Sequence, residues 1–450
     1  MSVVRQAIAP LYFFACIALG GSAQGISSNL FLQLTGLIIL SWAWLSRTTP
    51  RDSRAARSLG WIVALAVLLA LLQLIPLPPA IWTHFPGRQF AVDGYRLLGQ
   101  PLPWMPLSLS PTDTIATAMA LLPPLAMLAL ILKLGAYRDD WLVYALLFAT
   151  GISVAFGFLQ IRGDGMNHYF YPYSSWGTAA GLFANGNHQA TLLLVSIPFL
   201  VALAARRWRQ EPKPNDRLLT AIVAGGMAVV VAAGVAMNQS FALLIIGAPV
   251  IGAAALQLIP AGRVRLGRLA AMLGLLFLGA TAALAIMLFA GMSTSNQTSV
   301  TIRADIWAHS SRALADYGVT GAGIGTFPTL YPLTEDPAVV ERTYTNHAHN
   351  DYIELALEAG IPGVVLMFAF LAWWGRRAFA IWRSPDAAEM ARAACIASAA
   401  ILLHSLVDYP LRTAAIATCM AVAVALMADP ARHRHKASRA DIRPTRHLSL

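Results

Sequence analysis

Residues 301–363 read TIRADIWAHSSRALADYGVTGAGIGTFPTLYPLTEDPAVVERTYTNHAHNDYIELALEAGIPG, and a hydrophobic stretch lies on each side of them. Each stretch holds roughly thirty apolar and small residues, enough to cross a bilayer. The segment between them concentrates arginine, histidine and carboxylate side chains. A polar insert between two hydrophobic spans lies outside the membrane, and one with these side chains is the first place to look for a reaction.

The composition of the whole chain indicates a membrane protein. Of its 450 residues, 57% are hydrophobic and only 12% are charged, and the mean hydropathy is +0.61. Soluble domains average about 25% charged residues. Apolar runs of about 20 residues recur along the chain, and a helix of that length crosses a hydrocarbon layer of about 30 Å. We therefore predict an all-α, polytopic membrane protein.

We predict about twelve transmembrane helices, with both termini in the cytoplasm. In this topology most of the 32 lysine and arginine residues fall in cytoplasmic loops and in the C-terminal tail, as the positive-inside rule requires. The topology thus explains the net charge of +11, which gives no reason to expect a nucleic-acid partner. The predicted helices lie near residues 6–23, 27–46, 58–78, 112–134, 139–161, 186–205, 217–236, 239–258, 269–290, 358–381, 387–408 and 411–429.

These helices divide the chain into four parts. Residues 1–290 contain the first nine helices, and residues 291–357 form a large outer loop between helices 9 and 10. Residues 358–429 contain the last three helices, and residues 430–450 form a basic cytoplasmic tail. Polar residues also lie at the outer ends of the sixth, eleventh and twelfth helices, and we expect them to face the large loop.

The large loop contains two predicted helices. Arg303, Trp307 and Ser310 recur at helical spacing, on one face of an amphipathic helix over 301–316. The GAGIGTF segment that follows predicts glycine turns rather than a phosphate-binding loop, because no strand precedes it and no Gly-Lys-Ser/Thr follows it. A second helix begins after Asn350, a good N-cap residue, and ends at Gly360.

These elements place His349 just before the N-terminus of the second helix and Arg303 near the start of the first. Helix N-termini and guanidinium groups bind anions, and arginine holds phosphate oxygens through paired hydrogen bonds. A neutral imidazole accepts a proton from a hydroxyl. The pair therefore suits a phosphate-linked leaving group and an incoming hydroxyl. The alternatives are a structural salt bridge for Arg303 and a solvated loop position for His349.

His347, His349 and Asp351 also have the spacing of metal ligands. A zinc site needs three or four converging ligands, so this motif alone is a weak indication, and we expect no metal. The three cysteines all lie in apolar runs, where neither a disulfide framework nor a thiolate metal site is expected.

Several of these motifs resemble those of the O-antigen ligase and O-antigen polymerase family of bacterial inner-membrane proteins. The similarity lies in Arg-x-x-Ile-Trp from Arg303, His-Ala-His-Asn-Asp-Tyr from His347 and Glu-Ala-Gly-Ile-Pro-Gly from Glu358. Phe-Ala-Asn-Gly-Asn from Phe183 and His-Ser-Leu-x-Asp-Tyr-Pro from His404 belong to the same pattern. The motifs occur in the order that is found in the family.

The resemblance implies a GT-C-like helical membrane fold, a periplasmic position for the large loop, and a glycan donor carried on undecaprenyl diphosphate. It implies no nucleotide, metal or other cofactor. Arg303 would bind the diphosphate, and His349 would activate or orient an acceptor hydroxyl on lipid A–core or on another glycan. The other residues expected to contact substrate are His347, Asn350, Asp351, Trp307, Asn187, His188, His404 and Asp408.

The motifs do not separate ligases, which transfer a finished glycan to lipid A–core, from polymerases, which extend one lipid-linked glycan with another. We favour the ligase, and a protein O-glycan transferase is a third option. A transporter would place charged residues or broken helices in the middle of the membrane, whereas the predicted spans are almost free of charge. A scaffold would not need the arginine and the histidines.

Overall fold

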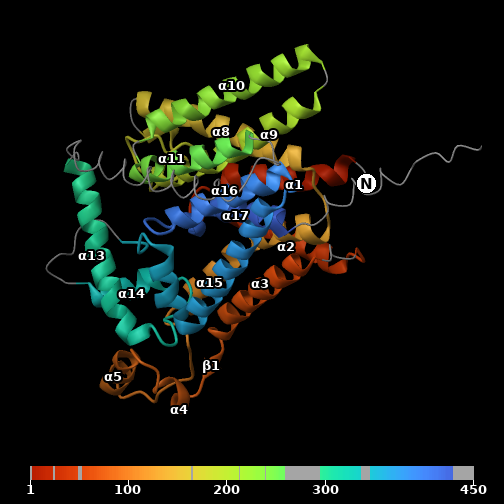
Figure 1. The fold of residues 1–450 in the computed structure, drawn as a ribbon. Helices are drawn as coiled ribbons and strands as arrows, with labels where there is room; N and C mark the ends of the chain where they lie inside the picture. The colour runs from red at the N-terminus through yellow and green to blue at the C-terminus, as the bar shows by residue number, and fades with distance from the viewer. Residues whose placement is uncertain are drawn as a thin grey trace, which may run out of the picture.

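The computed structural model describes residues 3–23, 26–48, 53–163, 166–211, 213–238, 240–258, 294–335 and 345–428. Within these ranges the regular structure is helical (Figure 1) apart from one antiparallel pairing of β1 (Pro76–Leu77) with β2 (Met105–Pro106). The predicted all-α fold is therefore confirmed.

Seven helical segments among the described residues are long and apolar enough to cross a membrane. They are α2 (Ser27–Leu45), α3 (Arg54–Leu72), the run Pro111–Lys133 made of α6 (Pro111–Ala120), α7 (Leu122–Leu128) and η1 (Ala129–Lys133), α8 (Asp139–Arg162), α9 (Gly186–Gln210), α10 (Pro214–Met237) and α15 (Asp351–Arg383). The chain is thus a multi-pass membrane protein.

Four further apolar helices in the described ranges are shorter. They are α1 (Val3–Leu19), α11 (Phe241–Ala255), α16 (Glu389–His404) and α17 (Ala414–Ala428). Each has 15 to 17 residues, fewer than the about 20 that cross a bilayer. Of the twelve predicted spans, seven are therefore present at full length. The predicted ninth span, near 269–290, lies outside the described residues.

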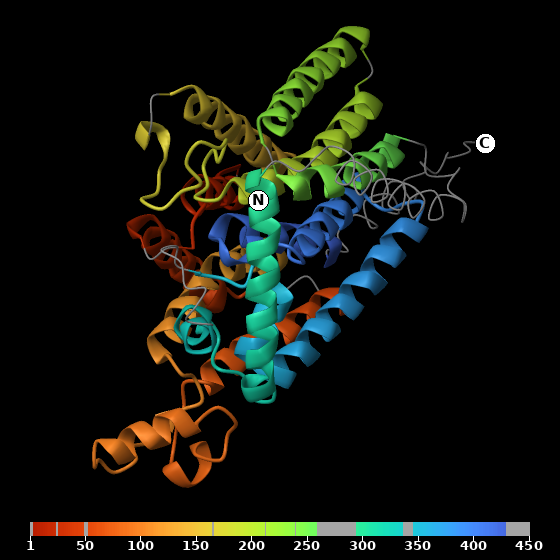
Figure 2. The same cartoon turned by 90° about the vertical axis from the view of Figure 1, so that its left-hand side faces the viewer.

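The remaining helices lie in the connections between the apolar helices. They are α4 (Pro79–Trp82), α5 (Gln89–Leu97), η2 (Met166–His168), η3 (Leu256–Leu258), α13 (Thr294–Tyr317), α14 (Phe327–Thr334) and η6 (Pro410–Arg412). The predicted amphipathic helix over 301–316 lies within α13, which packs against α14 and α15. Figure 2 shows α13 on the face of the bundle that is turned toward the viewer.

The centre of the bundle is α9. Helices α8, α10, α11 and α16 pack against it, and most of its length is buried. Helices α3 and α10 are mostly exposed along their apolar lengths, as expected of helices that face lipid. α17 is also buried, because its many alanines let α1, α7 and α16 approach closely.

A kink divides α15 into a short first part and a longer apolar part. At its start the side-chain oxygen of Asn350 accepts hydrogen bonds from the backbone N–H groups of Tyr352 and Ile353, so the predicted N-cap is confirmed. The kink lies at Gly360, which has a φ of 61°, and Pro362 follows it. The predicted helix end at Gly360 is therefore present as this kink.

The glycine-rich segment after α13 packs against this kink. The backbone N–H of Ala322 donates to the carbonyl of Leu357, and that of Gly323 donates to the carbonyl of Glu358. Three glycines of the segment have positive φ. The segment is therefore a set of glycine turns, as predicted. It leads from α13 to α14 and packs against the kink in α15.

We expect Gly360→Ala to lower the free energy of unfolding by about 1–3 kcal/mol, the usual cost of a strained backbone conformation. A Cβ atom at this position would lie 2.5 Å from the backbone nitrogen of Gly321. Denaturant unfolding of the protein in detergent micelles measures the change. Gly375→Ala is the matched control, because it lies in the same helix and its Cβ would meet nothing within 4 Å. Equal stability of the two variants would contradict the prediction.

Candidate functional site

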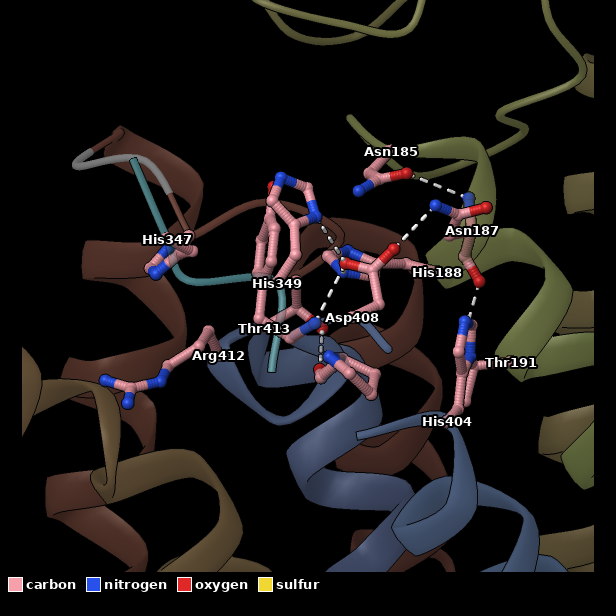
Figure 3. Close-up of polar contacts among 12 residues, drawn as sticks. Asn185, Asn187, His188, Thr191, His347, His349, His404, Asp408, Arg412 and Thr413 are labelled. Atoms are coloured by element: carbon pink, nitrogen blue, oxygen red, sulfur yellow. Dashed lines mark hydrogen bonds and ion pairs between the residues drawn. The ribbon is translucent and has the colours of Figure 1, made fainter. Parts of the chain in front are cut away.

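Asp408 is a fully buried carboxylate in the turn between α16 and η6. Its Oδ2 atom accepts a hydrogen bond of 2.5 Å from Nδ2 of Asn187 (Figure 3) and one of 3.4 Å from the guanidinium of Arg303. Its Oδ1 atom accepts a hydrogen bond of 2.8 Å from the backbone N–H of Tyr409. Because Asn187 lies in the first turn of α9 and Arg303 belongs to α13, Asp408 joins three segments that are far apart in the sequence.

Two histidines lie beside the same carboxylate. His349 Nδ1 is 3.4 Å from Asp408 Oδ1, and His188 Nε2 is 3.8 Å from the same atom. Burial alone would raise the pKa of Asp408, but His349, His188 and Arg303 outweigh burial and hold that pKa well below its usual value. Asp408 is therefore ionised at neutral pH. We call Asp408, Asn187, His188, Arg303 and His349 the Asp408 cluster.

The backbone of His349 is in the left-handed region, with a φ of 50°, and no other non-glycine residue in the described part of the chain has a positive φ. Contacts fix the residue before it. The N–H of Ala348 donates to Glu354 Oε2 (2.9 Å), and its carbonyl accepts from Trp307 Nε1 (2.8 Å). The residue after it, Asn350, caps α15. A conformation of this kind persists where its surroundings impose it, and such positions concentrate at active sites.

A second charged group lies next to the first. The guanidinium of Arg412 is 3.6 Å from Asp351, 3.3 Å from Glu354 and 3.0 Å from Glu358. Burial alone would lower the pKa of Arg412, but the three carboxylates outweigh burial and raise it. Glu354 also lies 2.9 Å from Nδ1 of His347. We call Arg412, Asp351, Glu354 and Glu358 the Arg412 cluster.

The buried ring of Tyr409 lies between the two clusters. Its centre is 5.0 Å from the ring centre of His188, 4.1 Å from that of His347 and 4.9 Å from that of His349. Burial raises the pKa of Tyr409 to about 12, so its hydroxyl stays protonated at neutral pH. The ring therefore sets the spacing of three imidazoles.

The ten predicted site residues divide into two groups. Five of them form the Asp408 cluster, in which residues of the large loop meet residues near the start of α9 and after the end of α16. The other five are His347, Asn350, Asp351, Trp307 and His404, and all have partners within the protein. For example, Nδ1 of His404 is 2.7 Å from the hydroxyl of Thr191 (Figure 3), and Ser405 donates a hydrogen bond of 2.8 Å to Asp351.

The prediction missed Tyr409, Arg412, Glu354 and Glu358 as site residues. The three acidic residues of α15 follow one another at intervals of three and four, which places them on one helix face. A buried acidic helix face needs a cation nearby. Arg412 lies at the outer end of the predicted helix over 411–429, on the same side of the membrane as this face. This spacing was the signal available in the sequence.

His347 and His349 do not converge on a common point. His347 lies against Glu354, whereas His349 lies against Asp408. In the described ranges no three His, Cys, Asp or Glu side chains are grouped as they are in a metal site.

A cavity of about 1270 Å³ lies beside the two clusters. His188, His349 and Arg412 are among the residues that line it. Apolar residues of α2 and α6, such as Leu30 and Met119, also line it. The cavity therefore runs from the histidines toward the apolar helices, and it has room for a substrate.

We expect Asp408→Asn to lower the free energy of unfolding at neutral pH by about 3–5 kcal/mol, because it leaves the neighbouring positive groups without their buried anion. The pKa of Asp408 is depressed in the folded protein, so its contribution is complete above the unfolded value of about 3.9 and is lost as the pH falls further. The difference from wild type should therefore shrink below about pH 4.

Unfolding in detergent between pH 3.5 and 8 tests this. The control is Asp93→Asn, because Asp93 is 54% exposed and pairs with Arg96 on the surface. This change should cost less than about 1 kcal/mol. A constant difference between wild type and Asp408→Asn across the pH range would contradict the prediction.

Residues 173–368 match a protein-family model described as O-antigen ligase. No curated protein matches the chain. The matched segment includes Arg303, His349, Asn187 and His188, whereas Asp408 follows it. The family resemblance predicted from the motifs is confirmed.

Proposed function

Because residues 173–368 belong to the O-antigen ligase family, whose members are enzymes that use lipid-linked glycans in membranes, we propose that this protein is a membrane glycosyltransferase. It moves a glycan from undecaprenyl diphosphate to an acceptor hydroxyl at the periplasmic face of the bacterial inner membrane. It acts as an O-antigen ligase, with lipid A–core as the acceptor. The Asp408 cluster is the observation that carries the proposal, since one buried carboxylate joins a guanidinium and an imidazole.

In this proposal His349 accepts the proton of the acceptor hydroxyl. Nδ1 of His349 lies toward Asp408, which leaves Nε2 for the hydroxyl (Figure 3). The acceptor oxygen forms a bond to the anomeric carbon of the donor sugar, and the bond from that carbon to the phosphate oxygen breaks. The proton passes to Nε2, and undecaprenyl diphosphate leaves. Asp408 orients the imidazole and stabilises its protonated form.

Arg303 binds the diphosphate in this proposal. A guanidinium carries five N–H donors, and the contact to Asp408 at 3.4 Å is a long one. The side chain of Arg303 is 26% exposed, so a phosphate reaches it without unfolding of α13. Paired hydrogen bonds to phosphate oxygens stabilise the charge that develops on the leaving group.

A polymerase would use the same chemistry with a second lipid-linked glycan as the acceptor. The two activities leave different intermediates in a strain that lacks the gene. Lipopolysaccharide and undecaprenyl-linked glycans, extracted and compared on gels, distinguish them. Long glycan on the carrier with bare lipid A–core indicates a ligase, and single repeat units on the carrier indicate a polymerase. No change in either fraction would overturn the proposal and favour the transporter.

We expect Arg303→Ala and His349→Ala each to lower transfer at least about 100-fold, the usual effect of losing a general base or a charge clamp. Arg303→Lys should also be poorly active, because an ammonium does not hold phosphate through two parallel hydrogen bonds. The assay is complementation of the deletion strain, with protein levels in the membrane measured alongside.

Matched controls come from the loop before α6. Arg96→Ala and His84→Ala replace the same residue types at exposed positions away from the cavity, and both should keep normal transfer. Wild-type transfer by Arg303→Ala and His349→Ala would remove both residues from the reaction.

A further inference from the structure

The cavity beside His349 has an aromatic wall that the reaction described above does not use. Tyr173 and Trp176, in the connection between α8 and α9, line this cavity together with His188 and His349. Their side chains remain 78% and 52% exposed. Large aromatic rings exposed at the mouth of a cavity indicate a binding surface, because an aromatic face gives a large contact area at a small cost in conformational entropy.

The connection that carries these two rings is fixed to the helix bundle. Tyr171 is buried, and its hydroxyl accepts a hydrogen bond of 3.1 Å from the backbone N–H of Gly21. The N–H of Ser175 donates to the carbonyl of Ala184 at 2.8 Å. The aromatic wall is therefore held in position before a ligand arrives, which lowers the entropic cost of binding.

Acidic side chains outnumber basic ones in the described lining of the cavity, and burial raises the pKa of Asp351 to about 7 and also raises that of Glu358. This lining contains four carboxylates and one arginine. These are Asp113, Asp351, Glu354, Glu358 and Arg412. Arg303 is not among the described residues that line it. A diphosphate would meet like charges in this cavity, whereas sugar hydroxyl or amino groups are donors for carboxylate oxygens.

We propose that this cavity is the subsite for the acceptor's glycan, with sugar rings packed on Trp176 and Tyr173 and with a preference for neutral or amino sugars over acidic ones. The inference rests on the proposed function and deepens it. The donor diphosphate then lies on the Arg303 side of Asp408, the acceptor lies on the cavity side, and His349 stands between them. The other explanation for Trp176 is an anchor in the membrane interface, where tryptophan is also common.

Binding of short sugars to the full chain in lipid nanodiscs tests the proposal. The probes are chitotriose, which is neutral, its fully deacetylated form, which carries amino groups, and tri-galacturonate, which is acidic. Saturation-transfer difference NMR gives an apparent Kd for each. We expect the first two probes to bind and tri-galacturonate to bind at least about tenfold more weakly, because four carboxylates line the site.

Trp176→Ala should weaken chitotriose binding at least about fivefold, because truncation of a central aromatic contact is among the most damaging changes at a binding site. Trp104→Ala is the matched control. Trp104 is 65% exposed and does not line the cavity, so its replacement should leave the Kd within about twofold. Tyr173→Ala is a second variant, with an expected loss in the same direction.

Equal affinity of wild type and Trp176→Ala for chitotriose would overturn the proposal, and so would tight binding of tri-galacturonate. A lower level of Trp176→Ala in the membrane, with an unchanged Kd, would show that Trp176 is an interfacial anchor. The binding assay needs no turnover, so it is separate from the test of the proposed function. Normal transfer by His349→Ala, together with Trp176-dependent sugar binding, would refute the reaction and keep the subsite.

Discussion

The arrangement of the site depends on the burial of one negative charge, that of Asp408. A carboxylate without solvent is stable only where positive groups and hydrogen-bond donors surround it. In this protein they come from the start of α9, from α13 and from the segment before α15. α13 packs through Ile306, Ala313 and Tyr317 in a hydrophobic cluster with α14, and its Arg303 also reaches Asp408.

The Arg412 cluster has the reverse arrangement, with one buried cation among three carboxylates on a single face of α15. Glu354 connects it to the Asp408 cluster, because its two oxygens contact His347 and the N–H of Ala348. The strained backbone of His349 therefore lies between the Asp408 cluster and the Arg412 cluster.

Local patterns in the sequence predicted a good part of this structure. The cap at Asn350, the glycine turns, the helix end at Gly360 and seven long spans all depend on neighbours within about one or two helical turns. The contacts of Asp408 with Asn187 and Arg303 join positions 221 and 105 residues apart, and helical periodicity contains no information on such pairs. The polar residues at the outer helix ends led us to expect that these segments face the large loop, but this pattern did not identify Asp408 as the residue that joins them.

The contacts of Asp408 also connect the two halves of the proposed reaction. Arg303 and His349 share its carboxylate, at 3.4 Å each. A diphosphate that takes hydrogen bonds from the guanidinium draws positive charge away from Asp408. When Arg303 neutralises less of its negative charge, Asp408 stabilises an imidazolium more strongly. In the proposed reaction, that imidazolium forms when His349 accepts the proton of the acceptor hydroxyl. Donor binding would thus favour acceptor activation in this reaction. In the proposed reaction, this one carboxylate therefore contacts both the residue that holds the leaving group and the residue that accepts the proton.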